Sequence, residues 1–246
     1  SKLIAEAAKD KQVLAIKITL YRAAEESKLV DALISATKRG IQVVVVVELK
    51  ARFDEQANIE WARLMEKEGI HVVYGVLGLK THNKNALIVR QEDNEIRQYV
   101  HIGTGNYNSD TASTFEDLGL FTSDPNITNE VASLFNSLTA FSEQQEFQNL
   151  IVAPNGVRPS LLELIQTQST SEGRIVIKVN SLQDPEIITE LYRASQQGCE
   201  IDLIVRGVCC LLPGVEGLSD NITVRSYLGR FLEHSRVYRF GRKRGD

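Results

Sequence analysis

Ile41-Gln42-Val43-Val44-Val45-Val46-Val47-Glu48-Leu49 contains five valines in a row. Valine is β-branched and disfavours a helix, and a strand this apolar has no face suited to water. The stretch therefore predicts a central strand of a sheet that is covered on both faces. Upstream, apolar side chains at helical spacing predict a helix over 27–39, with Ser27 as its N-cap and Gly40 as its stop. Val13–Thr19 is another apolar run, so the three segments predict a βαβ unit.

The segments downstream continue this alternating α/β pattern. Strands of 4–8 residues bounded by turn residues, and longer stretches with apolar side chains three and four apart, distinguish the two element types. The predicted elements are a helix over 53–68, strands over 70–74, 86–89 and 96–102, and a helix over 127–148.

The second half of the chain repeats the first. Residues 174–179 correspond to 14–18, with Lys178 matched to Lys17. A helix over 185–197 and a strand over 199–205 then follow in the same order as in the first half. Pro154-Asn155-Gly156 breaks the chain between the two copies. The sequence thus predicts an α/β fold with two tandem α/β/α domains, 1–153 and 154–246, related by internal duplication.

Composition limits the classes of function. The chain has 246 residues, of which 43% are hydrophobic and 24% charged, with a net charge of -4. This excludes a global basic field, so we expect no nucleic-acid partner. No apolar run reaches the roughly 18 residues of a membrane span, and no signal-peptide core is present, so a cytoplasmic location is expected. The three cysteines lack zinc-ligand spacing and are expected to be reduced packing residues.

The first candidate site is Gly78-Leu79-Lys80-Thr81-His82-Asn83-Lys84, which precedes the apolar run at 86–89. Side chains alternate along a strand, so His82 and Lys84 are predicted to point the same way from a sheet edge. An imidazole can attack phosphorus as a nucleophile, and a neighbouring ammonium can neutralise phosphate oxygens. The alternative is that His82 lies in an ordinary surface turn before a strand.

The second half carries a similar pair, His234 and Arg236, just before the predicted strand at 237–240. Two copies that face each other would bring His82 and His234 into one cleft. Further basic side chains at strand ends are predicted to line it, namely Arg22, Arg52 and Arg206. Arginine binds phosphate oxygens in bidentate fashion, so the set suits a phosphoryl substrate, with one imidazole as nucleophile and the other as acid. The alternative is that these arginines form a solvated face.

Several stretches together resemble the C-terminal half of the long-chain bacterial polyphosphate kinase family. They are Ile18-Thr19-Leu20-Tyr21-Arg22, residues 46–54, Val73-Tyr74-Gly75, Leu79-Lys80-Thr81-His82, residues 101–108 and Leu232-Glu233-His234-Ser235-Arg236-Val237-Tyr238. The resemblance implies a phospholipase D-like fold and a phosphohistidine at His82. It also implies that His234 and Arg206 contact the nucleotide, and that Arg22 and Arg52 lie at the magnesium and phosphate site. Phe115 stands where the family often has a tyrosine that stacks on the base.

The resemblance implies reversible transfer of the ATP γ-phosphoryl group to inorganic polyphosphate, with Mg²⁺ as cofactor. ATP, ADP and polyphosphate would be the small-molecule partners, in a homo-oligomer associated with the membrane periphery. The family's N-terminal regions are absent from this chain and its second domain ends early, so low activity is expected of the chain alone.

Two other functions are weighed against this one. A phospholipase D-type phosphodiesterase or nuclease requires an aspartate where this chain has Val89, and has lysine where this chain has Arg236. A non-catalytic polyanion-binding module would bind polyphosphate without using His82 as a nucleophile.

Overall fold

The structure, a computed structural model, describes residues 2–20, 28–48, 55–76, 78–140 and 146–242. These residues form two compact units. Unit 1 consists of the described parts of 1–113 and 117–150, and unit 2 of those of 114–116 and 151–246. The chain crosses to unit 2 at Leu150–Ile151, close to the boundary predicted after residue 153. Unit 2 also takes in the three residues 114–116, which the sequence did not indicate.

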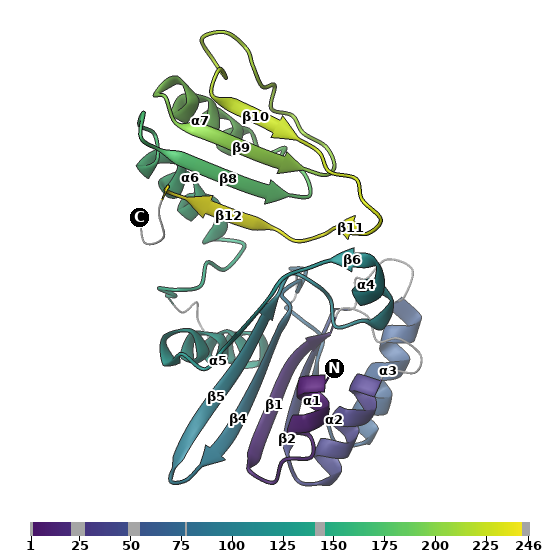
Figure 1. The fold of residues 1–246 in the computed structure, drawn as a ribbon. Helices are drawn as coiled ribbons and strands as arrows, with labels where there is room; N and C mark the ends of the chain where they lie inside the picture. Colours follow the sequence, from purple (N-terminus) through teal and green to yellow (C-terminus); the bar gives the residue numbers. More distant parts are fainter. Residues whose placement is uncertain (1, 21–27, 49–54, 77, 141–145, 243–246) are drawn as a thin grey trace. The chain divides into compact units, whose positions relative to one another are not determined.

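Unit 1 is built on a six-stranded sheet with the order β3-β2-β1-β4-β5-β7. Figure 1 labels β2, β1, β4 and β5 of this sheet. β1 (Val13–Leu20) and β2 (Gln42–Val47) are parallel neighbours, with α2 (Lys28–Lys38) between them in the chain, which confirms the predicted βαβ unit. The other elements are α1 (Lys2–Ala7), α3 (Glu55–Lys67), β3 (His71–Val73), β4 (Asn85–Glu92), β5 (Glu95–Gly103), α4 (Ser109–Thr114), β7 (Gly119–Thr122) and α5 (Pro125–Ala140). β4 and β5 form the predicted antiparallel hairpin.

The valine strand separates two hydrophobic cores. β2 lies between β3 and β1, and side chains alternate between the two faces of a strand. Val43, Val45 and Val47 pack into the core formed with α1, α2 and α3. Val46 packs on the opposite face against Val131 and Phe135 of α5. The prediction of a central strand covered on both faces is confirmed.

α5 is shorter than the helix predicted over 127–148. It ends at Ala140, and the described residues 146–150 are not helical. The backbone N–H groups of residues 148, 149 and 150 donate to the carboxylate of Glu130 at 2.8–3.0 Å, so they are held by a side chain of α5 and do not extend it. No helix in the described part of the chain is long and apolar enough to cross a bilayer.

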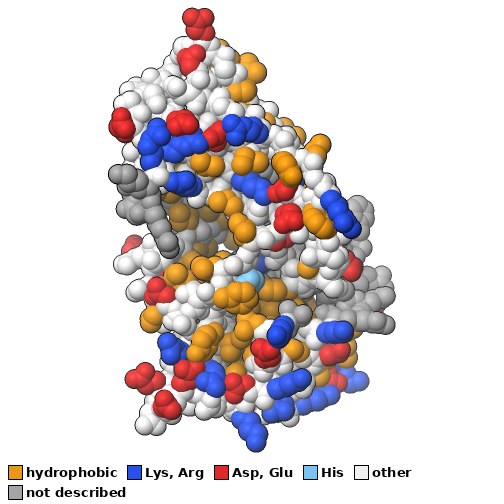
Figure 2. Space-filling view, in the orientation of Figure 1, with side chains coloured by type: hydrophobic (Ala, Val, Ile, Leu, Met, Phe, Trp, Pro, Cys, Tyr) orange, Lys and Arg blue, Asp and Glu red, His pale blue; other side chains and the backbone are white. Residues whose placement is uncertain are grey.

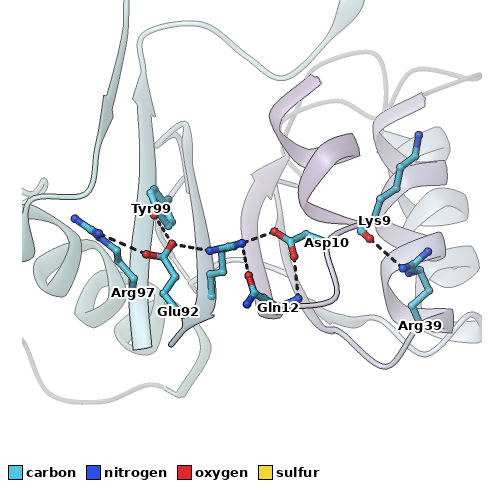
Figure 3. Close-up of polar contacts among 8 residues, drawn as sticks. Lys9, Asp10, Gln12, Arg39, Glu92, Arg97 and Tyr99 are labelled. Atoms are coloured by element: carbon cyan, nitrogen blue, oxygen red, sulfur yellow. Dashed lines mark hydrogen bonds and ion pairs between the residues drawn. The ribbon is translucent and has the colours of Figure 1, made fainter. Parts of the chain in front are cut away.

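A polar network closes the turn end of the β4–β5 hairpin (Figure 3). The guanidinium of Arg90 donates to Asp10 Oδ2 at 2.8 Å and to Glu92 Oε1 at 2.9 Å. Tyr99 Oη donates to the same Glu92 oxygen at 2.5 Å. The hydrogen bond from Arg90 holds the pKa of Asp10 below its ordinary value. Since β4 runs from Asn85 to Glu92, this network lies at the end of the strand away from His82 and Lys84.

Unit 2 is built on a four-stranded sheet with the order β10-β9-β8-β12. Its elements are β6 (Phe115–Glu116), α6 (Val157–Thr167), β8 (Arg174–Val179), α7 (Pro185–Gln196), β9 (Glu200–Val205), β10 (Ile222–Arg225), β11 (Leu232–Glu233) and β12 (Val237–Phe240). β10, β9 and β8 are parallel and β12 is antiparallel to β8. The strands β3, β2, β1 and β4 of unit 1 have the same order and the same directions, so the predicted duplication is confirmed.

The register of the strands corrects one detail of the duplication. In unit 1 Ala15 pairs with Gln42, and in unit 2 Arg174 pairs with Glu200. Gln42 and Glu200 each follow by two positions the glycine that ends the preceding helix. Ala15 therefore corresponds to Arg174, and Lys178, four residues further on, corresponds to Thr19. The sequence-based match of Lys178 to Lys17 was wrong by two residues, because both strands are apolar runs without an internal marker.

Candidate active site

His82 lies at the end of a tightly packed loop just before β4. Gly75 and Gly78 adopt the left-handed conformation, with φ of 65° and 82°, which favours glycine. A side chain at Gly75 would also place its Cβ 2.8 Å from Thr81 Oγ1, so the loop folds closely on itself. The His82 side chain is exposed at the end of this loop. An exposed imidazole on a constrained backbone can reach a substrate in solution.

Thr19 holds the backbone directly after His82. Its hydroxyl donates to the carbonyl O of Asn83 at 2.8 Å and accepts from the backbone N–H of Asn85 at 3.1 Å. Thr19 is the penultimate residue of β1 and only 4% exposed. A buried hydroxyl that both donates and accepts a hydrogen bond resists displacement, because breaking either bond leaves a buried polar group unpaired.

Lys84 is buried, with 7% of its surface exposed. Its Nζ donates to the carbonyl O of His82 at 2.5 Å, and its own carbonyl O accepts from the N–H of Gly103 at 2.9 Å. The ammonium therefore lies directly beside the backbone of the predicted nucleophile, on a strand start that is held in the sheet. In this place the charge is less screened than on the surface and stabilises an anion near His82 more strongly.

His101 lies on β5, the strand that pairs with β4. It lies opposite Ala86, and its Nδ1 is 2.6 Å from Tyr107 Oη. Its ring is also 4.5 Å from the ring of Phe121 between centroids. Burial lowers the pKa of His101 and raises the pKa of Tyr107, so near pH 7 both groups are favoured in the neutral form.

In unit 2, His234 is held beside the ring of Phe115. The two ring centroids are 4.9 Å apart at 40°. β6 and β11 pair in parallel, and the backbone N–H groups of His234 and Ser235 both donate to the carbonyl O of Glu116, at 3.1 and 3.0 Å. The short strand that unit 2 takes from residues 114–116 thus positions both the histidine and its aromatic neighbour.

The basic residue two positions after each histidine repeats one contact. Arg236 Nη1 donates to the carbonyl O of His234 at 3.2 Å, just as Lys84 Nζ donates to that of His82. Arg206 follows β9, as predicted, and its backbone N–H donates to the carbonyl O of Val179 at 3.3 Å. Its buried Nε has no hydrogen-bond partner among the described residues. This N–H is therefore an unused hydrogen-bond donor.

Two predicted residues lie outside the described part of the chain, namely Arg22 and Arg52. Among the residues described, no group of three His, Cys, Asp or Glu side chains is placed to hold a metal ion. His82 belongs to unit 1 and His234 to unit 2. Their meeting in one cleft depends on how the units are placed, and it stays a prediction.

Charged side chains of both signs are spread over the molecular surface that Figure 2 shows. On the face shown in Figure 2, basic and acidic side chains are intermixed over both units. This agrees with the net charge of -4.

Sequence reasoning did not identify two residues that support histidines of unit 1. Thr19 holds the backbone after His82, and Tyr107 contacts His101. Thr19 reads as one more strand residue, and Tyr107 lies in a loop. The only available signal was the pair of glycines around His101. A Cβ at Gly119 would lie 2.5 Å from His101 Nε2, and one at Gly103 would lie 2.9 Å from its Cε1. Glycines on neighbouring strands can thus mark a closely packed ring, although sequence alone does not show which strands are neighbours.

Comparison with known proteins places this geometry in context. Residues 1–144 match the family model "Polyphosphate kinase C-terminal domain 1", and residues 150–246 match "Polyphosphate kinase C-terminal domain 2". A polyphosphate kinase of Mycolicibacterium gilvum is 55% identical over 244 residues, which cover 97% of this chain and 34% of the relative. One of Synechocystis is 55% identical over 242 residues, covering 96% of this chain and 33% of the relative. The chain thus spans about a third of the length of the curated relatives it matches.

Solved structures give a consistent result. The crystal structure of polyphosphate kinase from Porphyromonas gingivalis matches with a TM-score of 0.87 and 40% identity, over 97% of this chain and 40% of that one. Phosphatidylserine synthase from Haemophilus influenzae matches with a TM-score of 0.59 and 10% identity, over 83% of this chain and 59% of that one. The second match concerns the fold alone. A phospholipase D family member, Nuc from Salmonella typhimurium, is also among the matching structures, with a TM-score of 0.44 and 17% identity over 60% of this chain and 90% of that one.

Proposed function

Because the chain belongs to the polyphosphate kinase family, we propose that it carries the phosphohistidine and nucleotide-binding part of an enzyme that reversibly transfers the γ-phosphoryl group of ATP to inorganic polyphosphate. His82 is the nucleophile of this proposal. The observation that supports it best is that an exposed imidazole is combined with a firmly held backbone and a buried ammonium on the same short segment.

The proposed reaction has two phosphoryl transfers. In the first, a ring nitrogen of His82 attacks the γ-phosphorus of ATP, the N–P bond forms, and the bond to the β,γ-bridging oxygen breaks to release ADP. In the second, a terminal oxygen of polyphosphate attacks the phosphohistidine, and the N–P bond breaks as the chain grows by one unit. Both transition states place negative charge on phosphoryl oxygens, which the ammonium of Lys84 stabilises.

We assign the nucleotide to unit 2. The Phe115 ring offers an apolar face for a base, and it lacks the hydroxyl of the tyrosine often found there in the family. His234 lies against that ring, 4.9 Å away between centroids. Arg206 and Arg236 would hold phosphate oxygens through their planar guanidinium groups.

Magnesium stays part of the proposal only as a companion of the nucleotide. When bound, Mg²⁺ would neutralise phosphate oxygens, and it is commonly held by substrate phosphates and water with one or two carboxylates. The described residues do not form a metal cage, and the two arginines assigned to this site by resemblance cannot ligate a cation. A homo-oligomer, association with the membrane periphery and a cytoplasmic location likewise stay predictions.

The test uses the full-length protein that carries this chain. We expect it to convert ATP and a short polyphosphate primer into ADP and longer polyphosphate, and to form ATP from ADP and polyphosphate. His82→Gln should abolish both directions. His71→Gln is the matched control, because His71 is exposed on β3 and lies outside the candidate site. If His82→Gln keeps activity in both directions, the proposal is refuted.

The same preparation distinguishes the other functions. A phospholipase D-type enzyme would hydrolyse bis(p-nitrophenyl) phosphate, for which we expect no activity. The position of the aspartate in that motif is occupied by Val89, which packs against the core on the α5 side of the sheet. A polyanion-binding module would bind polyphosphate equally well with and without His82 and transfer no phosphoryl group.

A further inference from the structure

The two units share one structural position for which neither the motifs nor the family resemblance implied a role. In unit 1, Ile18 pairs with Ala86, so the next residue, Thr19, faces Asn85, three positions after His82. In unit 2, Lys178 pairs with Val237, three positions after His234. The parallel pairings on the other side of each strand give the same correspondence. Thr19 and Lys178 therefore have the same place relative to the two histidines.

At this position in unit 1, the side chain holds the segment that carries the histidine. The Thr19 hydroxyl bonds to the backbone of Asn83 and Asn85, on both sides of Lys84. A short side chain is sufficient, because the backbone of β4 is directly beside it.

At this position in unit 2, the longer Lys178 does the same through side chains. Its Nζ donates to Glu233 Oε2 at 2.5 Å and to Ser235 Oγ at 2.6 Å. These are the residues immediately before and after His234. The side chains of Lys178 and Glu233 are 20% and 17% exposed, and Ser235 is 5% exposed. The ion pair is thus shielded from water more than a typical surface pair, and its loss would leave a largely buried carboxylate without its cation.

We propose that Lys178 is a positioning residue for His234: by holding Glu233 and Ser235, it fixes the imidazole against the ring of Phe115. The backbone bonds from His234 and Ser235 to Glu116 set where the segment lies. They hold the segment through its backbone, and Lys178 holds it through the side chains on either side of His234, so the backbone from which the imidazole reaches Phe115 is fixed from two directions. The claim that Lys178 positions the imidazole is independent of the proposed function. Only the expected effect on catalysis rests on that function.

The orientation is tested by NMR on this chain. The ¹H–¹³C signal of the His234 ring carries a ring-current shift from Phe115, and Phe115→Leu defines its position without that neighbour. In Lys178→Met, which keeps the length of the side chain without the ammonium, we expect the signal to move toward the Phe115→Leu position. Lys17→Met is the matched control. Lys17 is also a strand lysine, whose Nζ donates to Asn136 Oδ1 at 3.0 Å in unit 1, and its removal should leave the His234 signal in place.

An unchanged His234 signal in folded Lys178→Met would overturn the proposal. If Lys178→Met does not fold, Ser235→Ala removes one acceptor and keeps the ion pair. We then expect a smaller movement of the signal in the same direction, and no movement would overturn the proposal.

Kinetics on the full-length protein test the consequence for catalysis. A misplaced catalytic group can cost up to about a hundredfold, so we expect kcat/KM for ATP to fall about tenfold to a hundredfold in Lys178→Met. Glu233→Gln should lower kcat/KM by a smaller factor in the Lys178→Met background than in the wild type, because Lys178 acts partly through Glu233. Fully additive losses would contradict that route. If the wild-type protein transfers no phosphoryl group, the proposed function fails, and the NMR comparison still decides the role of Lys178.

Discussion

Replacement of Gly119 by alanine tests how closely His101 is packed in unit 1. The new methyl group would lie 2.5 Å from His101 Nε2, whereas ordinary contacts are 3.4–4 Å, so something must move. The backbone of β7 is held by its pairing with β5, which leaves the imidazole as the group that moves. A displaced ring loses its 2.6 Å hydrogen bond with Tyr107. Gly119→Ala should therefore act through His101.

The magnitude follows from these two effects. Overpacking costs about 1–3 kcal/mol in a well-filled core, and the lower end applies here, because Gly119 is exposed and His101 only partly buried. The lost hydrogen bond adds about 1 kcal/mol. We expect Gly119→Ala to lower the free energy of unfolding of unit 1 by about 1–2 kcal/mol. Gly229→Ala is the control, because the nearest atom to its new Cβ would be in the ring of Tyr227, which is 61% exposed and can give way.

Urea unfolding followed by tryptophan fluorescence provides the assay. Trp61 is the only tryptophan and lies on α3, so the signal reports on unit 1. The decisive comparison is a double-mutant cycle with His101→Ala. In that background the methyl group introduced by Gly119→Ala meets no imidazole, and the cost of this substitution should nearly vanish. An equal cost with and without His101 would refute the reasoning.

Three further predictions concern unit 1. Burial lowers the pKa of His101, so the unfolded chain binds the extra proton more readily. The contribution of His101 to stability should be complete above about pH 6.5, the ordinary value for histidine, and be lost as the pH falls through its lowered folded value. Urea unfolding between pH 7.5 and 5 should show this slope relative to His101→Gln. Thr19→Val keeps the shape but leaves the Asn85 N–H unpaired, and should cost about 1–3 kcal/mol in the same assay, with recovery in Thr19→Ser. Glu130→Gln weakens acceptance of the N–H groups at 148–150, so hydrogen exchange at these amides should accelerate, and unchanged exchange would show that the carboxylate does not hold them.

The sequence predicted the parts of the fold that depend on apolar patterning. The βαβ unit around the valine strand, the β4–β5 hairpin and the duplication are all confirmed. Short elements with weak patterns were missed, such as the two-residue strands β6 and β11. Their pairing joins residues far apart in the chain, and local propensity contains no information on it. The residue-by-residue match of the two halves was wrong for a related reason. The register of a strand depends on the strands with which it pairs, and these are not visible in the local sequence.

For the candidate site, chemistry-bearing residues were easier to predict than those that support them. His82, Lys84 and His234 could be named from their residue types and spacing. The structure adds that Lys84 and Arg236 both bond to the backbone of the histidine two positions before them. Thr19 and Lys178 became apparent only through strand register, since a threonine or lysine within a strand has no distinctive sequence pattern.

The most direct test of the central claim is to locate the phosphoryl group on the protein. The full-length protein is incubated with γ-labelled ATP and magnesium, and the label is tested for the acid lability and alkali stability of a phosphohistidine. The chain has four histidines, so peptide mapping can distinguish them. We predict label on His82 in the wild type and in His71→Gln, and none in His82→Gln. Label that persists in His82→Gln, or that maps to another histidine, would contradict the assignment of His82 as the nucleophile.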